Sequence, residues 1–157
     1  MFIGKDQFMK SFDAVQLFRS GFNCSQSVVS VFADEYGIDK HVLRLLSSGF
    51  GGGMGGMQNV CGAASGAFMI LGLKYGYGEE SESYKKPQLY KIIQDFSREF
   101  SAQNGHLRCY DLLGCDLNTE DGKEFFKKNE LREKVCVECV KNSVELLEKF
   151  LIQSDKS

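Results

Sequence analysis

A glycine-dense stretch at residues 49–66, ending in the sequence CGAASG, is the feature that most limits how this chain can fold. Glycine adopts positive φ at little cost, so eight glycines within eighteen residues predict a loop that packs closely against other elements. The apolar residues that follow Cys61 predict a helix, which places this thiol in a helix first turn. The partial positive charge and unpaired N–H groups of a helix N-terminus favour thiolate over thiol. We therefore expect Cys61 to carry the chemistry of this protein.

The rest of the chain has apolar residues at helical spacing, and no run alternates with the period of a β-strand. Asn23, Asp39 and Thr119 are suitable N-caps, and Pro87 suits a helix first turn. The predicted helices begin near residue 6, after Asn23, after Asp39, at Cys61, at Pro87, near Leu107, at Thr119 and near Leu131. A chain of 157 residues is long enough to bury one core. The sequence thus predicts an all-α single domain, residues 1–157, a bundle of about seven or eight helices with a glycine-rich loop before a central helix.

The charge pattern excludes several classes of partner. The net charge is −2 with no long run of one sign, which argues against nucleic-acid binding. Residues 1–10 lack the pattern of a signal peptide, and the longest uncharged apolar stretch, residues 66–73, is too short to cross a bilayer. We therefore predict a cytoplasmic protein that binds no membrane. The apolar fraction of 43% is compatible with a homodimer.

Six cysteines are many for a cytoplasmic chain, where structural disulfides are rare. Such thiols are typical of metal ligands or redox groups, although each one taken alone has a simpler explanation as a small buried apolar side chain. Cys136 and Cys139 form a C-x-x-C pair on one helix face, unlike the strand-to-helix turn of a thioredoxin. The spacing of the six does not match a zinc ribbon, so any metal would need ligands from distant helices.

The glycine loop also contains the pattern G-x-G-x-x-G, which alone predicts no dinucleotide site because a helix, not a strand, precedes it. The loop can instead leave backbone N–H groups free to bind a thiolate, a sulfide or an anion. On this basis we expect cofactor contacts from Gly53, Gly55, Gly56 and Gly62. The alternative is that glycines here only permit tight helix packing.

Three segments together resemble a known family: GFGGGMGGM at residues 49–57, CGAASGA at 61–67 and LGLKYG at 71–76. They are similar to the C_GCAxxG_C_C family of redox-active proteins, whose length is close to that of this chain. The family name records four cysteines, which the resemblance assigns to Cys24, Cys61, Cys109 and Cys136, with Cys139 as a substitute for the last. Cys115 is then an extra cysteine, and its role and that of His106 are open. Because related domains are associated with iron–sulfur clusters, the resemblance implies such a cofactor.

These observations lead to one main hypothesis with alternatives. We predict that the four cysteines meet in one pocket and act in redox chemistry. They would either bind an iron–sulfur cluster that passes electrons to a partner protein, or exchange thiols and disulfides without a metal. A structural zinc site and a non-catalytic helical interaction module, with its thiols scattered through the core, are the alternatives. The sequence leaves open whether the chain is an oxidoreductase or an electron carrier.

Overall fold

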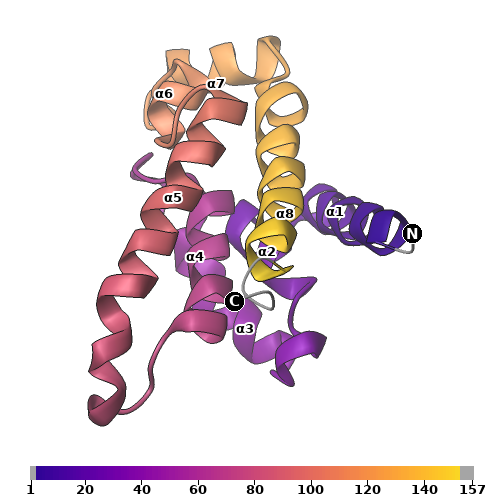
Figure 1. Ribbon diagram of the computed structural model, residues 1–157. Coiled ribbons are helices and arrows are strands. Elements are labelled where there is room, and N and C mark those ends of the chain that lie inside the picture. The colour runs from indigo at the N-terminus through magenta and orange to yellow at the C-terminus, as the bar shows by residue number, and fades with distance from the viewer. Residues whose placement is uncertain (1–2, 153–157) are drawn as a thin grey trace.

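The computed structural model describes residues 3–152, with side chains described from residue 9, and this part of the chain is an all-α single domain (Figure 1). The predicted fold class and number of helices are confirmed, while the predicted domain bounds extend past the described residues at both ends. The described helices are α1 (Ile3–Ser20), α2 (Cys24–Ser30), α3 (Lys40–Ser47), α4 (Gly62–Tyr75), α5 (Lys86–Asn104), α6 (Cys109–Leu113), α7 (Glu120–Lys128) and α8 (Val137–Ile152). Three short 3₁₀ segments and a π-helical turn at Arg132–Cys136 supplement them.

Side chains cap the helices where the sequence predicts. Asn23 caps α2 with a reciprocal pair, in which the Gln26 N–H donates to Asn23 Oδ1 at 2.9 Å and the Asn23 N–H donates to Gln26 Oε1 at 3.0 Å. Asp39 accepts from the Val42 N–H at 3.0 Å at the start of α3. The α2 helix is shorter than predicted, because the chain leaves it at residue 31 and reaches Gly37 through a turn and a 3₁₀ segment.

The centre of the domain is the pair α4 and α8. In Figure 1, α8 (yellow) runs along the bundle, with α4 and the long α5 beside it. The α4 helix is apolar on every side and lies among α2, α5 and α8, which explains why most of its residues are buried. A buried hydrogen bond from Ser143 Oγ to the Ala63 carbonyl, 2.7 Å long, joins the two central helices.

The end of the pair away from the glycine loop is filled by aromatic side chains. Phe96 of α5 is fully buried, and its ring centroid lies 6.1 Å from Phe68, 6.3 Å from Phe100 and 5.5 Å from Phe150. The Tyr75 hydroxyl donates to the Phe150 carbonyl at 2.6 Å, which ties the end of α4 to the end of α8. This end is the filled part of the core.

Candidate functional site: a cavity lined by cysteines

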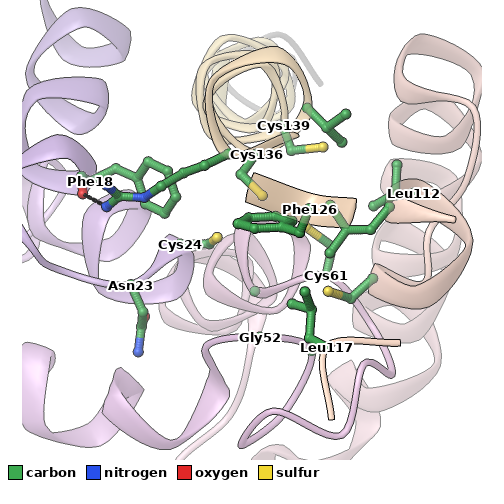
Figure 2. Close-up of a pocket in the computed structure, with 16 residues that line it drawn as sticks. Phe18, Asn23, Cys24, Gly52, Cys61, Leu112, Leu117, Phe126, Cys136 and Cys139 are labelled. Atoms are coloured by element: carbon green, nitrogen blue, oxygen red, sulfur yellow. Dashed lines mark hydrogen bonds between the residues drawn. The ribbon is translucent and has the colours of Figure 1, made fainter. Parts of the chain in front are cut away.

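Five of the six cysteines line one cavity of about 200 Å³ at the other end of the α4–α8 pair. They come from the start of α2 (Cys24), the residue before α4 (Cys61), the start of α6 (Cys109), the end of the π turn (Cys136) and the first turn of α8 (Cys139). Figure 2 shows the labelled cysteines turning toward the same space from different helices. We call this space the thiol cavity. The structure thus brings together all four cysteines that the resemblance selects, along with Cys139.

Glycines on α4 allow its close approach to the N-terminus of α2. A Cβ atom added to Gly62 would lie 3.0 Å from the Phe50 carbonyl oxygen and 3.1 Å from Cys24 Cβ. One added to Gly66 would lie 3.0 Å from the Ser25 carbonyl oxygen. Because a larger side chain at either position would push the helices apart, these glycines set the approach of Cys24 to Cys61.

A short antiparallel contact holds Cys61 next to Cys109. The Cys61 N–H donates to the Leu107 carbonyl at 2.9 Å, and the Cys109 N–H donates to the Asn59 carbonyl at 2.7 Å. Val60 and Arg108 form an isolated bridge between these bonds. Two segments nearly fifty residues apart in the sequence therefore deliver their thiols to the same place.

The π turn governs how the last two cysteines enter the cavity. In this turn the Val137 N–H bonds the Arg132 carbonyl, five residues back, so the turn holds one more residue than an α-helical turn. Cys136 closes the turn and Cys139 follows in regular α-helix, and both line the cavity. Single π turns of this kind are frequent at functional sites.

Cys61 is the thiol most disposed to ionise. It is the N-cap of α4, one residue earlier than predicted, and its side chain is 6% exposed. The neighbouring thiol of Cys139 lowers the pKa of Cys61, whereas burial raises it. The backbone N–H groups of Ala63 and Ala64 lower this pKa further. The Cys61 side chain nevertheless makes no capping hydrogen bond of ordinary geometry. The helix N-terminus thus acts on the sulfur as the sequence predicts.

Three of the other cavity thiols, those of Cys24, Cys109 and Cys139, favour their protonated form. The pKa of Cys139 lies far above its ordinary value, and contact with the Cys61 thiol is the larger cause and burial the smaller one. The Cys136 thiol and burial likewise raise the pKa of Cys24, and burial and the neighbouring sulfurs raise the pKa of Cys109 to about 12. The thiols therefore form two interacting pairs, Cys61 with Cys139 and Cys24 with Cys136, beside Cys109.

The predicted glycines occupy different places. Gly53 and Gly62 line the thiol cavity, whereas Gly55 and Gly56 are exposed in the loop and are not among the lining residues. Gly53 has φ of +68°, and a Cβ there would lie 2.7 Å from the Asn59 nitrogen, so the tight loop needs glycine at this position. A cofactor role for the four glycines stays a prediction.

Two residues of the site escaped the sequence analysis. Arg132 is the one cationic side chain among the described residues that line the cavity, and its guanidinium lies 4.6 Å from the Phe18 ring centroid and donates to the Phe18 carbonyl at 2.7 Å. Gln58 lies next to the site: its backbone carbonyl accepts from the Tyr110 N–H at 3.1 Å, and the residue is 2% exposed. Neither belongs to a recognisable motif, so no local signal marks them. Cys115 and His106 lie outside the cavity lining.

The cysteine-rich lining of the cavity is compatible with a metal cofactor. Among residues 9–152, no three His, Cys, Asp or Glu side chains are grouped closely enough to hold one metal ion. Thiolates are ligands of both zinc ions and iron–sulfur clusters. Five thiols around one cavity provide that ligand type from widely separated positions.

The sequence profile of one protein family, described as "Putative redox-active protein (C_GCAxxG_C_C)", matches residues 22–150. The chain belongs to the C_GCAxxG_C_C family. Membership supports a redox role for the protein and confirms the resemblance seen in the sequence. The match covers every cysteine of the C_GCAxxG_C_C chain.

Two further comparisons, with curated proteins and with solved structures, gave no match to this C_GCAxxG_C_C protein. None of the helices in the described part of the chain is both long and apolar enough to span a membrane. The cytoplasmic location and the homodimer remain predictions.

Proposed function

We propose that this protein binds an iron–sulfur cluster in the thiol cavity and transfers electrons. The observation that carries the proposal is the convergence of five thiols, from four parts of the chain, on one cavity. Thiol exchange needs only two cysteines, so five in one cavity exceed that need. The ligands would be Cys24, Cys61, Cys109 and either Cys136 or Cys139.

The cavity residues have complementary tasks in this proposal. Leucine, valine and phenylalanine side chains exclude water from the sulfurs: Leu112, Leu113, Leu117, Phe126 and Val135. Because neighbouring sulfurs and burial raise the pKa of Cys24, Cys109 and Cys139, four thiolates would not form here without positive charge among them. Bound iron would supply that charge and accept or release one electron at a time. Arg132 at the cavity wall would offset part of the remaining negative charge.

Anaerobic purification tests the proposal directly. We expect a brown protein in which iron and acid-labile sulfide are present in stoichiometric amounts. Cys24→Ser, Cys61→Ser and Cys109→Ser should each lose most of the iron, whereas Cys115→Ser, a buried cysteine outside the cavity lining, is the matched control and should retain it. Comparing Cys136→Ser with Cys139→Ser identifies the fourth ligand. A chain that takes up zinc or no metal after reconstitution with iron and sulfide contradicts the proposal.

The contact between Cys61 and Cys139 favours a second candidate function, thiol–disulfide exchange. The Cys61 thiolate would attack one sulfur of a small disulfide such as oxidised glutathione, releasing one glutathione thiolate. Cys139 would then attack the Cys61 sulfur and release the second, so that the protein thiols lose two electrons and two protons in total. In this case Cys139→Ser should accumulate the mixed disulfide on Cys61, detectable by mass spectrometry, and the metal-free protein should be fully active.

A further inference from the structure

The Asn23 side chain joins the start of α2 to the segment that leads into the glycine loop. Its Oδ1 accepts from the Gln26 N–H at 2.9 Å and so caps the helix that begins with Cys24. Its Nδ2 donates to the Ser48 carbonyl at 2.9 Å, at the start of the 3₁₀ segment Ser48–Phe50. One carboxamide therefore makes a bond within α2 and a bond to the chain before the glycine loop, next in sequence to a cysteine of the thiol cavity.

Gln26 adds a second link between the same two parts of the chain. Its Oε1 accepts from the Asn23 N–H at 3.0 Å, and its Nε2 donates to the Arg44 carbonyl of α3 at 3.1 Å. The last turn of α3 and the residue after this helix are thus both bonded to the first turn of α2. Because these four hydrogen bonds have ordinary lengths, they fix the Asn23 side chain in one position.

The glycine loop packs directly against the Asn23 side chain. A Cβ added to Gly51 would lie 2.6 Å from Asn23 Cβ, Cγ and Nδ2, closer than real Cβ contacts. The φ of Gly51 is −65°, which any residue can adopt, so the close contact and not the turn requires glycine here. The next two residues, Gly52 and Gly53, line the thiol cavity together with Asn23. In Figure 2 the Asn23 amide points away from the cysteine sulfurs, so any effect of this residue on them is indirect.

We propose that Asn23 is a positioning residue that holds the glycine loop against the Cys24 side of the thiol cavity through its bond to the Ser48 carbonyl. The inference rests on the proposed function, in which Cys24 is a ligand of the cluster. Cys24 is only partly buried, so a loop that moves away from α2 would expose it to water and speed the release of iron. A residue that served only as a helix cap could be replaced by serine without this effect, because serine caps about as well as asparagine.

Alkylation of individual cysteines in the reduced, metal-free protein tests the contact. Asn23→Ser keeps an oxygen that can cap α2 but removes the Nδ2 donor to Ser48. We expect the alkylation rate of Cys24 to rise about fivefold, the factor by which losing a hydrogen bond of about 1 kcal/mol shifts a local opening equilibrium. The rate at Cys115, which is buried outside the cavity lining, should stay unchanged. An unchanged rate at Cys24, or an equal rise at both cysteines, would overturn the proposal.

Gly51→Ala tests the same contact from the loop and leaves residue 23 unchanged, which covers the case in which Asn23→Ser does not fold. Because the added methyl group would collide with the Asn23 side chain, we expect the alkylation of Cys24 to rise here too. Gly49→Ala is the matched control, since a Cβ at Gly49 meets no atom within 4 Å, and its Cys24 should react at the wild-type rate. A wild-type rate in Gly51→Ala would show that the loop does not depend on its contact with Asn23.

The iron-loaded protein provides the second readout. At a temperature well below unfolding, iron should pass to a chelator faster in Asn23→Ser and in Gly51→Ala than in the wild type, and at the wild-type rate in Gly49→Ala. Unchanged release in the first two variants overturns the inference and leaves the proposed cluster intact. If the wild-type chain binds no iron, the proposed function fails, and the alkylation of Cys24 alone decides whether Asn23 holds the loop in place.

Discussion

The two ends of the α4–α8 pair are built from different side chains for different purposes. At one end, the rings of Phe68, Phe100 and Phe150 surround the fully buried Phe96. At the other end, five thiols border a cavity of about 200 Å³. The same two helices thus carry a filled core and an open one.

The difference separates stability from function along a single pair of helices. Protein interiors are normally close-packed, and apolar space left unfilled costs stability. The aromatic end follows that rule, whereas the thiol end departs from it at the place where the reactive side chains meet. We interpret the open end as space kept for a ligand and the aromatic end as the part that keeps the helices in position around it.

The largest expected loss of stability comes from the aromatic end. Phe96→Ala should lower the free energy of unfolding by about 3–5 kcal/mol, since it removes a fully buried ring that contacts three others. Urea denaturation followed by circular dichroism measures this change. Phe125→Ala is the control, because that ring is 48% exposed, and it should stay within about 0.5 kcal/mol of wild type. Similar losses in both variants would refute the assignment of the core.

Alkaline pH should destabilise the thiol end. Burial and sulfur contacts raise the pKa of Cys24, Cys109 and Cys139, so above pH 8.5 these thiols keep protons in the folded state that the unfolded chain has lost. Each group then lowers the free energy of unfolding by up to about 1.4 kcal/mol for each further pH unit. Cys61 has the opposite sign: its lowered pKa adds stability that is present above about pH 8.5 and lost as pH falls through its folded pKa.

Denaturation midpoints of the reduced, metal-free protein from pH 6 to 10.5 measure this balance. We expect a decline above about pH 8.5, because the raised pKa values of Cys24, Cys109, Cys139 and, outside the cavity, Cys115 outweigh the lowered pKa of Cys61. The decline should be shallower in Cys139→Ala, which removes one of the titrating groups. A midpoint that is flat with pH would show that these thiols are hydrated in the folded protein.

Two glycines of α4 should respond to the same substitution with opposite signs. A Cβ at Gly72 meets no atom within 4 Å, so Gly72→Ala should stabilise the protein by about 0.5–1 kcal/mol through helix propensity. Gly62→Ala gains the same stabilisation from helix propensity, but the added methyl group forces α4 away from Cys24, at a cost of about 1–3 kcal/mol. We expect net destabilisation by about 1 kcal/mol, measured by thermal unfolding. Stabilisation in both variants would show that α2 can shift away from α4 at little cost in stability.

The smallest change in stability should accompany the loss of the site. Cys61→Ser should alter the free energy of unfolding by less than about 1 kcal/mol, because serine is a good N-cap and can bond the free N–H groups at the start of α4. Iron binding should nevertheless be lost. Circular dichroism and iron analysis on the same sample test both statements. Global unfolding of this variant would show that the thiol end, like the aromatic end, is needed for the fold.

Much of the fold could be predicted because its signals are local. Asn23, Asp39 and Thr119 cap the helices that follow them, and Pro87 lies in the first turn of α5. The position of Cys61 at a helix N-terminus also follows from neighbouring residues alone. The structure places it at the N-cap of α4, one residue before the predicted first turn. Such features need only contacts within one turn of backbone.

The details of the site could not be predicted in the same way. The spacing of Cys136 and Cys139 predicts that both lie on one face of a regular helix. The structure has a π turn at Arg132–Cys136, for which the sequence gives no clear signal. Gln58 reads as a loop residue in the sequence, yet it is buried and bonded to residues 115–117, nearly sixty positions away.

The sequence by itself determined which segments are helical, where most of those helices begin and which thiol lies at a positive helix end, because these depend on short-range backbone hydrogen bonds and side-chain periodicity. The tertiary structure alone decided that Cys139 interacts with Cys61, that Cys24 interacts with Cys136 and that the Gln58 side chain bonds the backbone of Cys115 and Leu117. These contacts join segments far apart in the chain, and local sequence signals do not reach across such distances. Gly62 and Gly66 add to this by letting α4 approach the start of α2, where Cys24 lies.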